Sequence, residues 1–69
     1  MQFGYHLKNL RVKQGLHQRE LADMLKVDRS VVSKWESGAR LPDARMLIRL
    51  SECLHVGIEE ILEPLMNEK

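Results

Sequence analysis

The side chains with the most binding chemistry to offer share one edge of a short segment, and all of them donate hydrogen bonds: Arg29, Ser30, Ser33 and Lys34. They lie on one helical face once Val32 and Trp35 are turned inward. Arg and Lys suit the guanine edge in the major groove of DNA, and Ser suits several partners. Val31 either touches a thymine methyl group or belongs to the core. This edge is therefore a candidate for reading base pairs, and a merely solvated surface is the alternative.

Catalytic and metal-binding chemistry finds little support. The single cysteine permits no internal disulfide, and no pairing of Cys with His has the spacing of a zinc site. Cys53 stands near His55, but neither a third ligand nor an orienting acid accompanies them. Surface acids such as Glu59 and Glu60 form no nucleophile–base pair with the scattered histidines. We therefore predict no enzyme, no metal and no cofactor.

The elements that position the donor-rich edge must be few, because the chain has only 69 residues. Residues 1–69 are expected to form a single domain. Their 43% hydrophobic content is too high for a disordered chain, and with four Gly and two Pro they are unlike a many-turned β-protein. No apolar run could span a membrane and no secretory signal opens the chain, which suits the cytoplasm.

Hydrophobic periodicity predicts five helices and no strand, over about 3–14, 18–25, 29–37, 44–54 and 58–63. Gly15 is a stop signal, and Asp28 and Asp43 are expected N-caps. Pro64 should end or kink the last helix, which leaves residues 64–69 as a fraying tail. The expected fold class is all-α, a compact five-helix bundle.

The second and third predicted helices are separated only by residues 26–28. Ala22 is small where a crossing helix would approach, and Val27, Val32 and Trp35 would fill the angle between the two helices. A pair crossed in this way is the helix-turn-helix, whose second helix can lie in the major groove of DNA. A plain αα-hairpin of a bundle is the alternative that geometry alone does not exclude.

A longer pattern runs through most of the chain. Its pieces are Leu7-x-x-Leu10-Arg11, Gly15-Leu16-x-Gln18-x-x-Leu21-Ala22-x-x-Leu25, Val27-x-x-Ser30-x-Val32-Ser33-Lys34-Trp35-Glu36-x-Gly38, Pro42, Leu47-x-x-Leu50-x-x-x-Leu54-x-Val56 and Ile61-Leu62. In order and spacing these pieces closely resemble the phage-repressor-like (Cro/repressor, XRE-type) helix-turn-helix domain. The resemblance covers about residues 4–62 and implies the lambda-repressor-like DNA-binding fold.

The resemblance implies sequence-specific binding of double-stranded DNA and transcriptional regulation, most simply repression by occupancy of a promoter. Residues 29–37 would be the recognition helix in the major groove. Arg29, Ser30, Ser33 and Lys34 would contact bases, with Lys34 alternatively reaching a phosphate. The residues implied to contact phosphates are Gln18, Ser37, Gly38 and Arg40. His17 departs from the Ser or Thr cap usual in the family, and its imidazole is a further candidate for a phosphate contact. Gln18 would also brace the recognition helix, and Gly38 equally suits a left-handed helix cap.

Two further features follow from the resemblance. Arg11 and Glu36 would form a partly buried ion pair that ties the first helix to the third, because each would otherwise be a buried charge without a partner. Lys26 and His55 stand where the family commonly has Gly. An L-residue in the left-handed conformation costs roughly 1–2 kcal/mol, so we expect strain at Lys26, whereas His is among the better non-Gly residues for the position of His55.

The charged side chains are unevenly divided along the chain. Residues 1–40 hold eight Lys or Arg and four Asp or Glu, a net charge of +4, and residues 41–69 hold three and six, a net charge of −3. This favours a side that faces a polyanion, although a solvated surface of mixed charge is the alternative. The acidic half also carries an apolar stripe: Ile58, Ile61, Leu62, Leu65 and Met66. We expect these residues to form a homodimer interface; the alternative is that they only cap the monomer core.

A different class of function stays open. The bundle could serve as a protein-interaction module, such as an antitoxin or an anti-repressor partner, that buries its apolar tail against another chain. Such a module would keep its function with alanine at positions 29, 30, 33 and 34. Binding to random DNA duplexes distinguishes the two classes most cheaply.

Overall fold

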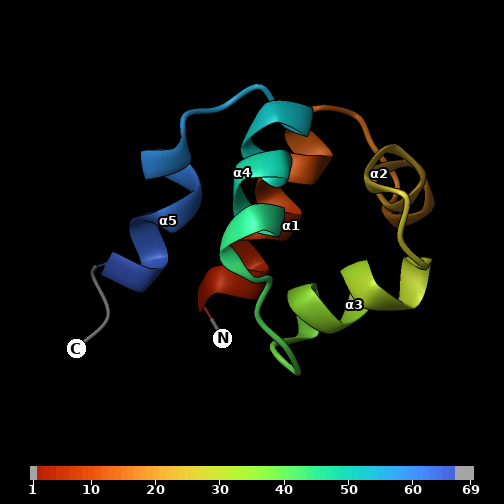
Figure 1. Cartoon of the computed structure of the whole chain (residues 1–69), viewed down its shortest axis with the longest axis horizontal. Coiled ribbons are helices and arrows are strands. Elements are labelled where there is room, and N and C mark those ends of the chain that lie inside the picture. The colour runs from red at the N-terminus through yellow and green to blue at the C-terminus, as the bar shows by residue number, and fades with distance from the viewer. Residues whose placement is uncertain (1, 67–69) are drawn as a thin grey trace.

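The computed structural model describes residues 2–66, and within that range it contains five helices and no strand. The helices are α1 (Gln2–Lys13), α2 (Gln18–Leu25), α3 (Arg29–Ser37), α4 (Ala44–Cys53) and α5 (Ile58–Met66) (Figure 1). The predicted all-α class is confirmed. The bounds of α2 and α3 coincide with those expected from the sequence, and the last residues expected for α1 and α4 are each one too far along the chain.

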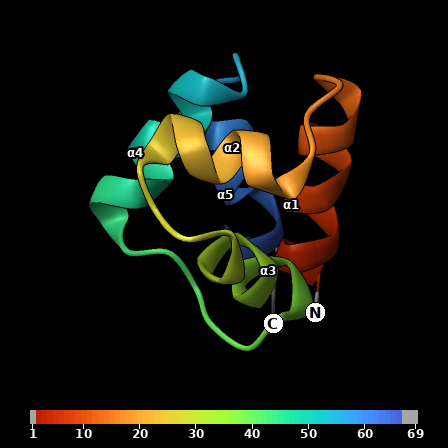
Figure 2. The same cartoon turned by 90° about the vertical axis from the view of Figure 1, so that its right-hand side faces the viewer.

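The five helices surround one interior. Helix α1 packs against α3 and α5, α2 packs against α3 and α4, and α4 packs against α5. Helix α4 passes in front of α1 in Figure 1, and the turned view shows α4 and α1 on opposite sides of the molecule, with α2 and α3 toward the viewer (Figure 2). Helix α3 lies along the lower edge in both views. It is therefore an outer element with one face left for solvent.

All five helices contribute to the core. Its buried apolar residues are Phe3, Leu7, Leu10, Leu21, Ala22, Leu25, Val32, Trp35, Leu50, Leu54 and Ile61. They follow the helical spacing expected from the sequence, with Val32 and Trp35 as the inward positions of α3. Burial of these side chains is the main stabilising contribution, because the chain has neither a disulfide nor a dense set of aromatic residues.

The helix ends show why the elements begin and stop where they do. The Asp43 carboxylate accepts a hydrogen bond from the N–H of Met46 at 2.9 Å, which caps the start of α4. Asp28 occupies the N-cap position of α3 without that bond, and its carboxylate accepts from the Ser30 hydroxyl instead, at 3.4 Å. Lys26 and His55 follow α2 and α4 with φ of 60° and 58°, as expected for positions that favour glycine.

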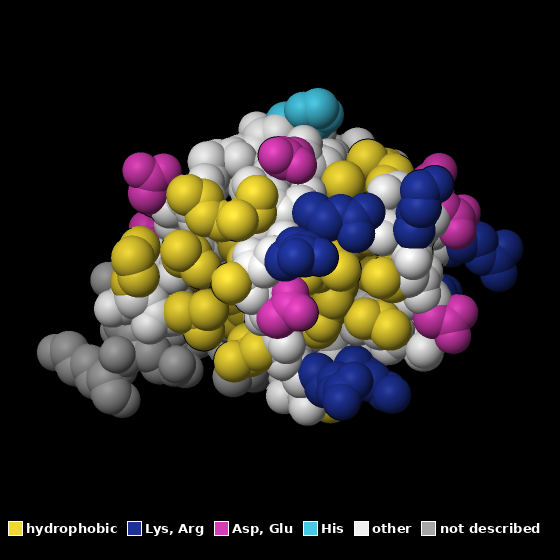
Figure 3. Space-filling model, in the orientation of Figure 1, with side chains coloured by type: hydrophobic (Ala, Val, Ile, Leu, Met, Phe, Trp, Pro, Cys, Tyr) yellow, Lys and Arg dark blue, Asp and Glu magenta, His cyan; other side chains and the backbone are white. Residues whose placement is uncertain are grey.

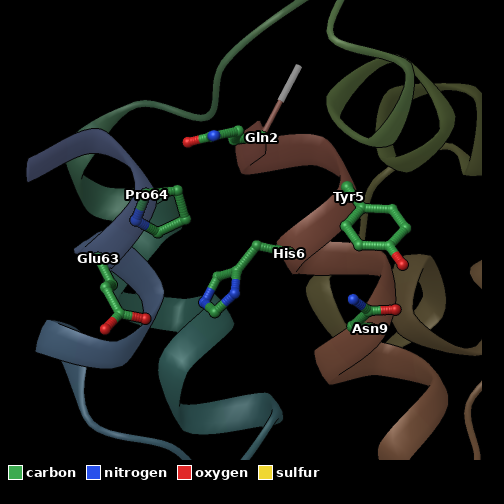
Figure 4. Close-up of a pocket in the computed structure, with 6 residues that line it drawn as sticks. All are labelled: Gln2, Tyr5, His6, Asn9, Glu63 and Pro64. Atoms are coloured by element: carbon green, nitrogen blue, oxygen red, sulfur yellow. The ribbon is translucent and has the colours of Figure 1, made fainter. Parts of the chain in front are cut away.

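The expected end of the last helix at Pro64 is wrong, because α5 continues through this residue to Met66. A proline inside a helix leaves the carbonyl four residues earlier without its usual N–H donor. That carbonyl belongs to Glu60, and the imidazole Nε2 of His6 lies 2.7 Å from it. His6 reaches from α1 toward α5 beside Pro64 (Figure 4). A side chain from another helix thus replaces the missing donor; the rest of the expected tail, residues 67–69, lies outside the described part.

Gly4 allows the closest approach of two helices. A Cβ atom built on Gly4 would lie 2.3 Å from the carbonyl oxygen of Glu36 and 2.8 Å from that of Trp35. Both distances are far shorter than van der Waals contact, so only glycine lets α1 meet the end of α3 at this point. This contact fixes the position of α3, and with it the donor-rich edge.

Candidate nucleic-acid interface

The outer edge of α3 carries the donors picked out from the sequence. Arg29, Ser30 and Lys34 are exposed, and Ser33 is half-buried. Val31 is also half-buried and packs against the core, so it lies at the border of this edge. A row of hydrogen-bond donors with no large apolar side chain at its centre is the surface that a base-reading helix presents.

The connection between α2 and α3 holds the two helices at a fixed angle. Lys26 takes the left-handed conformation, and its N–H donates to the carbonyl oxygens of Ala22 and Asp23. The N–H of Val27 donates to Ala22 as well, at 3.0 Å, and the Val27 side chain packs against the core. Ala22 itself is buried where the helices cross. The short turn is therefore rigid, with its polar groups bonded within the turn and its apolar residue inside.

An ion pair ties α1 to α3, as the resemblance implied. The Arg11 guanidinium donates from Nε to Glu36 Oε2 at 2.6 Å and from Nη2 to Oε1 at 3.0 Å. The two side chains are only 8% and 5% exposed. Arg11 Nη1 also donates to the carbonyl of Leu16 at 2.7 Å, which secures the loop after α1. The geometry is bidentate, so both charges are satisfied despite their burial.

Gln18 extends this pair to the surface. Its amide Nε2 donates to Glu36 Oε1 at 3.0 Å, and its Oε1 accepts from Arg29 Nη1 at 3.3 Å. The first residue of α2 thus contacts the first residue of α3, which is the bracing expected of Gln18. This connection from the buried ion pair to Arg29 is the main feature of the site that sequence reasoning did not foresee. The sequence signal was only that Gln18, Arg29 and Glu36 each begin or end a helix near the same place.

The loop after α3 leaves fewer groups for phosphate than expected. The N–H of Gly38 donates to the carbonyls of Lys34 and Trp35, and the N–H of Arg40 donates to Lys34 at 3.2 Å. The Ser37 hydroxyl donates to Lys34 as well, at 3.1 Å. Gly38 therefore acts as the left-handed cap, with φ of 87°. These two N–H groups are therefore bonded within the chain, which leaves the exposed side chain of Arg40 for phosphate, and that of Ser37 once its hydroxyl turns away from the Lys34 carbonyl.

His17 is exposed directly before α2. Its N–H donates to the Glu20 carboxylate at 2.8 Å, which helps to start the helix. Figure 3 shows Lys and Arg side chains over α4 in the middle of one face and toward α2 and α3, with acidic side chains among them. The charge of this face is mixed, so hydrogen-bonding geometry argues for a polyanion more strongly than net charge does.

The residues expected to form the dimer interface on α5 differ in how exposed they are. Ile61 is 1% exposed and belongs to the core, so its inclusion in an interface is wrong: its side chain is already covered within the chain. Ile58, Leu62 and Leu65 are half-buried, and Met66 is 62% exposed. Hydrophobic side chains gather over α4 and α5 in Figure 3. The α5 apolar face, defined as Ile58, Leu62, Leu65 and Met66, stays accessible.

The described residues show neither a metal site nor a reactive cysteine. Within residues 2–66 no group of three or more His, Cys, Asp or Glu side chains could hold a metal ion. Burial raises the pKa of the Cys53 thiol, a nearby Arg49 lowers it in part, and Glu52 raises it further. A thiol with a raised pKa stays protonated and is a poor nucleophile. No helix in this part of the chain is long and apolar enough to cross a membrane.

A short crossed pair of helices, with a three-residue turn and a donor-rich outer edge on the second, defines the helix-turn-helix class. A helix-turn-helix family model matches residues 7–61. The chain therefore belongs to the phage-repressor-like (XRE-type) helix-turn-helix family.

Curated proteins are similar to this chain as well. The HTH-type transcriptional activator BcrR of Enterococcus faecalis is 40% identical over 62 residues, which cover 90% of this chain and 30% of BcrR. The uncharacterized HTH-type transcriptional regulator YqaE of Bacillus subtilis (strain 168) is 36% identical over 67 residues, 97% of this chain and 58% of that protein. The SPbeta prophage-derived regulator YonR of the same organism is 36% identical over 61 residues, 88% of this chain and 56% of YonR. The chain thus spans less than two thirds of the length of each relative.

Proposed function

We propose that the chain binds double-stranded DNA in a sequence-specific way, with α3 in the major groove, and regulates transcription. The observation that carries this proposal is the braced edge of α3: four donors face outward, and the first of them, Arg29, is held by Gln18 at 3.3 Å. The names of the relatives, all HTH-type transcriptional regulators, support the same class. Such a role requires the compartment that holds the DNA, so we place the domain in the cytoplasm.

The proposed DNA-binding residues fall into two groups, those that contact bases and those that contact phosphates. We assign base contacts to Arg29, Ser30, Ser33 and Lys34, because base edges are recognised by groups that enter the groove. Phosphate contacts are assigned to a second set: His17, Gln18, Ser37 and Arg40. Gly38 joins that set only through its cap, which positions the loop between Ser37 and Arg40. Phosphate contacts set the position of the protein along the duplex and contribute affinity, but they carry no sequence information.

A homodimer would give the site its specificity. One recognition helix covers too few base pairs to mark a unique place in a genome, and two-fold dimers place two helices about 34 Å apart, one turn of DNA. The α5 apolar face supports an isologous contact, because Leu62 and Leu65 are only partly covered and Met66 is 62% exposed. A two-fold contact there would involve helices other than α2 and α3.

The direction of regulation follows from where the protein sits on a promoter. Occupancy that excludes the polymerase gives repression, which needs no further surface on the chain, and we take this as the primary reading. The relative BcrR is named as an activator, which favours a second candidate: recruitment of the transcription machinery. A promoter fused to a reporter distinguishes the two by the sign of the change in expression.

The test of DNA reading is a selection of duplexes from a random pool, followed by affinity measurements on the selected duplex and on random DNA. Arg29→Ala and Lys34→Ala should each weaken the selected duplex by roughly 1–3 kcal/mol if the residue reads a base. An equal loss on random DNA would make that residue a phosphate contact instead. Glu52→Gln, an exposed change on α4, should leave both affinities unchanged.

A protein-interaction module is the competing reading. It predicts that the wild-type chain enriches no duplex from the pool. It also predicts that alanine at positions 29, 30, 33 and 34 leaves binding to a protein partner intact. Either result would indicate that the functional surface is the α5 apolar face rather than α3.

A further inference from the structure

Asp28 is an exposed acidic residue directly before α3, where the donor-rich edge begins. Two donors of that edge, Arg29 and Ser30, follow it at once. The N-terminal residues of a helix in the major groove are the ones that contact base edges. We propose that Asp28 is a base-contacting residue and that its carboxylate specifies cytosine by accepting a hydrogen bond from the N4 amino group. This inference rests on the proposed function and adds an acceptor to an edge of donors.

The Asp28 carboxylate does not cap α3. The N–H of Val31, which an N-cap side chain commonly bonds, donates to the main-chain carbonyl of Asp28 at 2.9 Å. Asp43 stands at the same position of α4 and does use its carboxylate, which accepts from the N–H of Met46 at 2.9 Å. The same residue type at equivalent positions therefore has a structural bond in α4 and lacks it in α3.

The Asp28 carboxylate has no strong partner among the described residues either. The neighbouring cation, Arg29, donates to Gln18 at 3.3 Å instead. Oδ2 of Asp28 accepts from the Ser30 hydroxyl at 3.4 Å, which is long for a hydrogen bond between two oxygen atoms. Within residues 2–66 this is the bond that the carboxylate accepts, so Oδ1 is available to a donor from another molecule.

Electrostatics limits what that donor is. A carboxylate at this edge is repelled by the phosphates on both sides of the groove, so it lowers the affinity for any duplex unless it meets a donor on a base. The major groove offers two such donors, the N4 amino group of cytosine and the N6 amino group of adenine. Adenine carries the acceptor N7 beside N6, which repels a carboxylate, whereas cytosine has no acceptor beside N4 within its own base. Guanine and thymine present O6 and O4 and exclude the carboxylate.

The proposed contact predicts two changes of opposite sign when the carboxylate is removed. The preference for cytosine at one base pair should fall, because the acceptor for N4 is lost. Binding to random DNA should become tighter, because a negative charge beside the phosphates is lost as well. A role of Asp28 confined to the start of the helix predicts neither change.

The experiment uses the duplex that the wild-type chain selects from a random pool, together with every single-base-pair change of that duplex. The variants are Asp28→Asn and Asp28→Ala. Asparagine keeps the size of the side chain, but its amide carries a donor as well as an acceptor and no longer excludes guanine and thymine. Each variant should lower the preference for one cytosine by about five- to tenfold and leave the preferences at the other positions unchanged. Each should bind random DNA about two- to threefold more tightly at low salt.

Two controls isolate the contact. Asp23→Asn removes the same charge from an exposed position of α2 and should leave every base preference unchanged. Ser30→Ala separates a direct contact from an effect through the Ser30 hydroxyl, because Asp28→Asn should still lower the preference at the same base pair in that background. Circular dichroism and the melting temperature verify that each variant is folded.

The outcomes that would overturn the inference are distinct from a failure of the proposed function. If both Asp28 variants keep every wild-type preference, Asp28 contacts no base. If the effect of Asp28→Asn disappears in the Ser30→Ala background, Asp28 acts only by holding Ser30. A wild-type chain that enriches no duplex contradicts the proposed function itself, and the inference falls with it.

Discussion

At the scale of single residues, local backbone strain and close contact are visible at a few positions. Lys26 and His55 adopt the left-handed conformation that L-residues avoid, with φ of 60° and 58°. At Gly4 the backbone is not strained; the absence of a side chain lets α1 contact the backbone at the end of α3. Each of these residues affects the stability of the fold through its backbone rather than through side-chain contacts: Lys26 and His55 lower it, and Gly4 allows the helices to pack closely.

Replacing Lys26 by glycine should stabilise the protein. The left-handed turn costs an L-residue roughly 1–2 kcal/mol, and the greater freedom of glycine in the unfolded chain offsets part of this. We expect the melting temperature to rise by several degrees, since 1 kcal/mol corresponds to about 4–8 °C in a chain of this size. Lys26→Ala is the control and should not raise it. A lower melting temperature for Lys26→Gly would show that the turn is not strained.

Replacing Gly4 by alanine should destabilise the protein. The added methyl would meet the Glu36 carbonyl at 2.3 Å, so the helices would have to separate. Overpacking of this kind costs about 1–3 kcal/mol, which thermal unfolding can measure. Gly57→Ala is the matched control, because its Cβ would meet only the Glu59 carboxylate, at 3.2 Å and at the end of a flexible side chain. Equal melting temperatures for the two variants would contradict the close α1–α3 contact.

At the scale of elements, the described helices divide into a unit that presents the site and a scaffold that holds it. Helices α2 and α3 form the former, braced by the Gln18–Arg29 bond, and α1 anchors them through Arg11 and Gly4. Helix α5 closes the core with Ile61, leaves Ile58, Leu62 and Leu65 half-buried, and exposes Met66. Its second half depends on α1, since His6 bonds the carbonyl that Pro64 leaves without a donor.

This dependence predicts coupling between His6 and Pro64. His6→Ala removes the partner of the Glu60 carbonyl and should cost about 1 kcal/mol, the usual value for such a hydrogen bond. In a Pro64→Ala background the helix supplies its own N–H, so the same substitution should cost distinctly less. A double-mutant cycle in urea measures the difference. Additive effects of the two substitutions would mean that His6 does not compensate for the proline.

The sequence predicted the helices well because their apolar residues follow one period and each is bounded by a local signal, such as Asp43 before α4 or the turn at Lys26. It failed at Pro64 because the argument was local, whereas the compensating donor comes from His6, which lies 54 positions before the Glu60 carbonyl that it bonds. The candidate readers on α3 followed from the same period. The Gln18 bond to Glu36 did not, because the contact between the start of α2 and the end of α3 depends on how three helices cross.

At the scale of the whole molecule, the donor-rich edge and the α5 apolar face belong to different elements. The proposed reading of DNA by α3 and the proposed pairing of two chains through α5 therefore do not compete for the same side chains. The charge division along the chain fits this arrangement, since residues 1–40 carry a net charge of +4 and residues 41–69 a net charge of −3.

The proposed dimer predicts that a charge on the α5 apolar face weakens association. Met66→Glu should shift the chain from dimer to monomer at micromolar concentrations in analytical ultracentrifugation, because Met66 is 62% exposed and its change leaves the core intact. Met24→Glu makes the same substitution at an exposed position of α2 and should leave the dimer in place. A wild-type chain that stays monomeric, with and without DNA, would contradict the dimer.

The most direct test of DNA reading by α3 is a nuclear magnetic resonance titration of the chain with the duplex it selects. The largest shift changes should fall on the backbone amides of residues 29–34 and on the Arg29 side chain, followed by the start of α2. Shift changes confined to α5, or none at all along α3, would contradict the account.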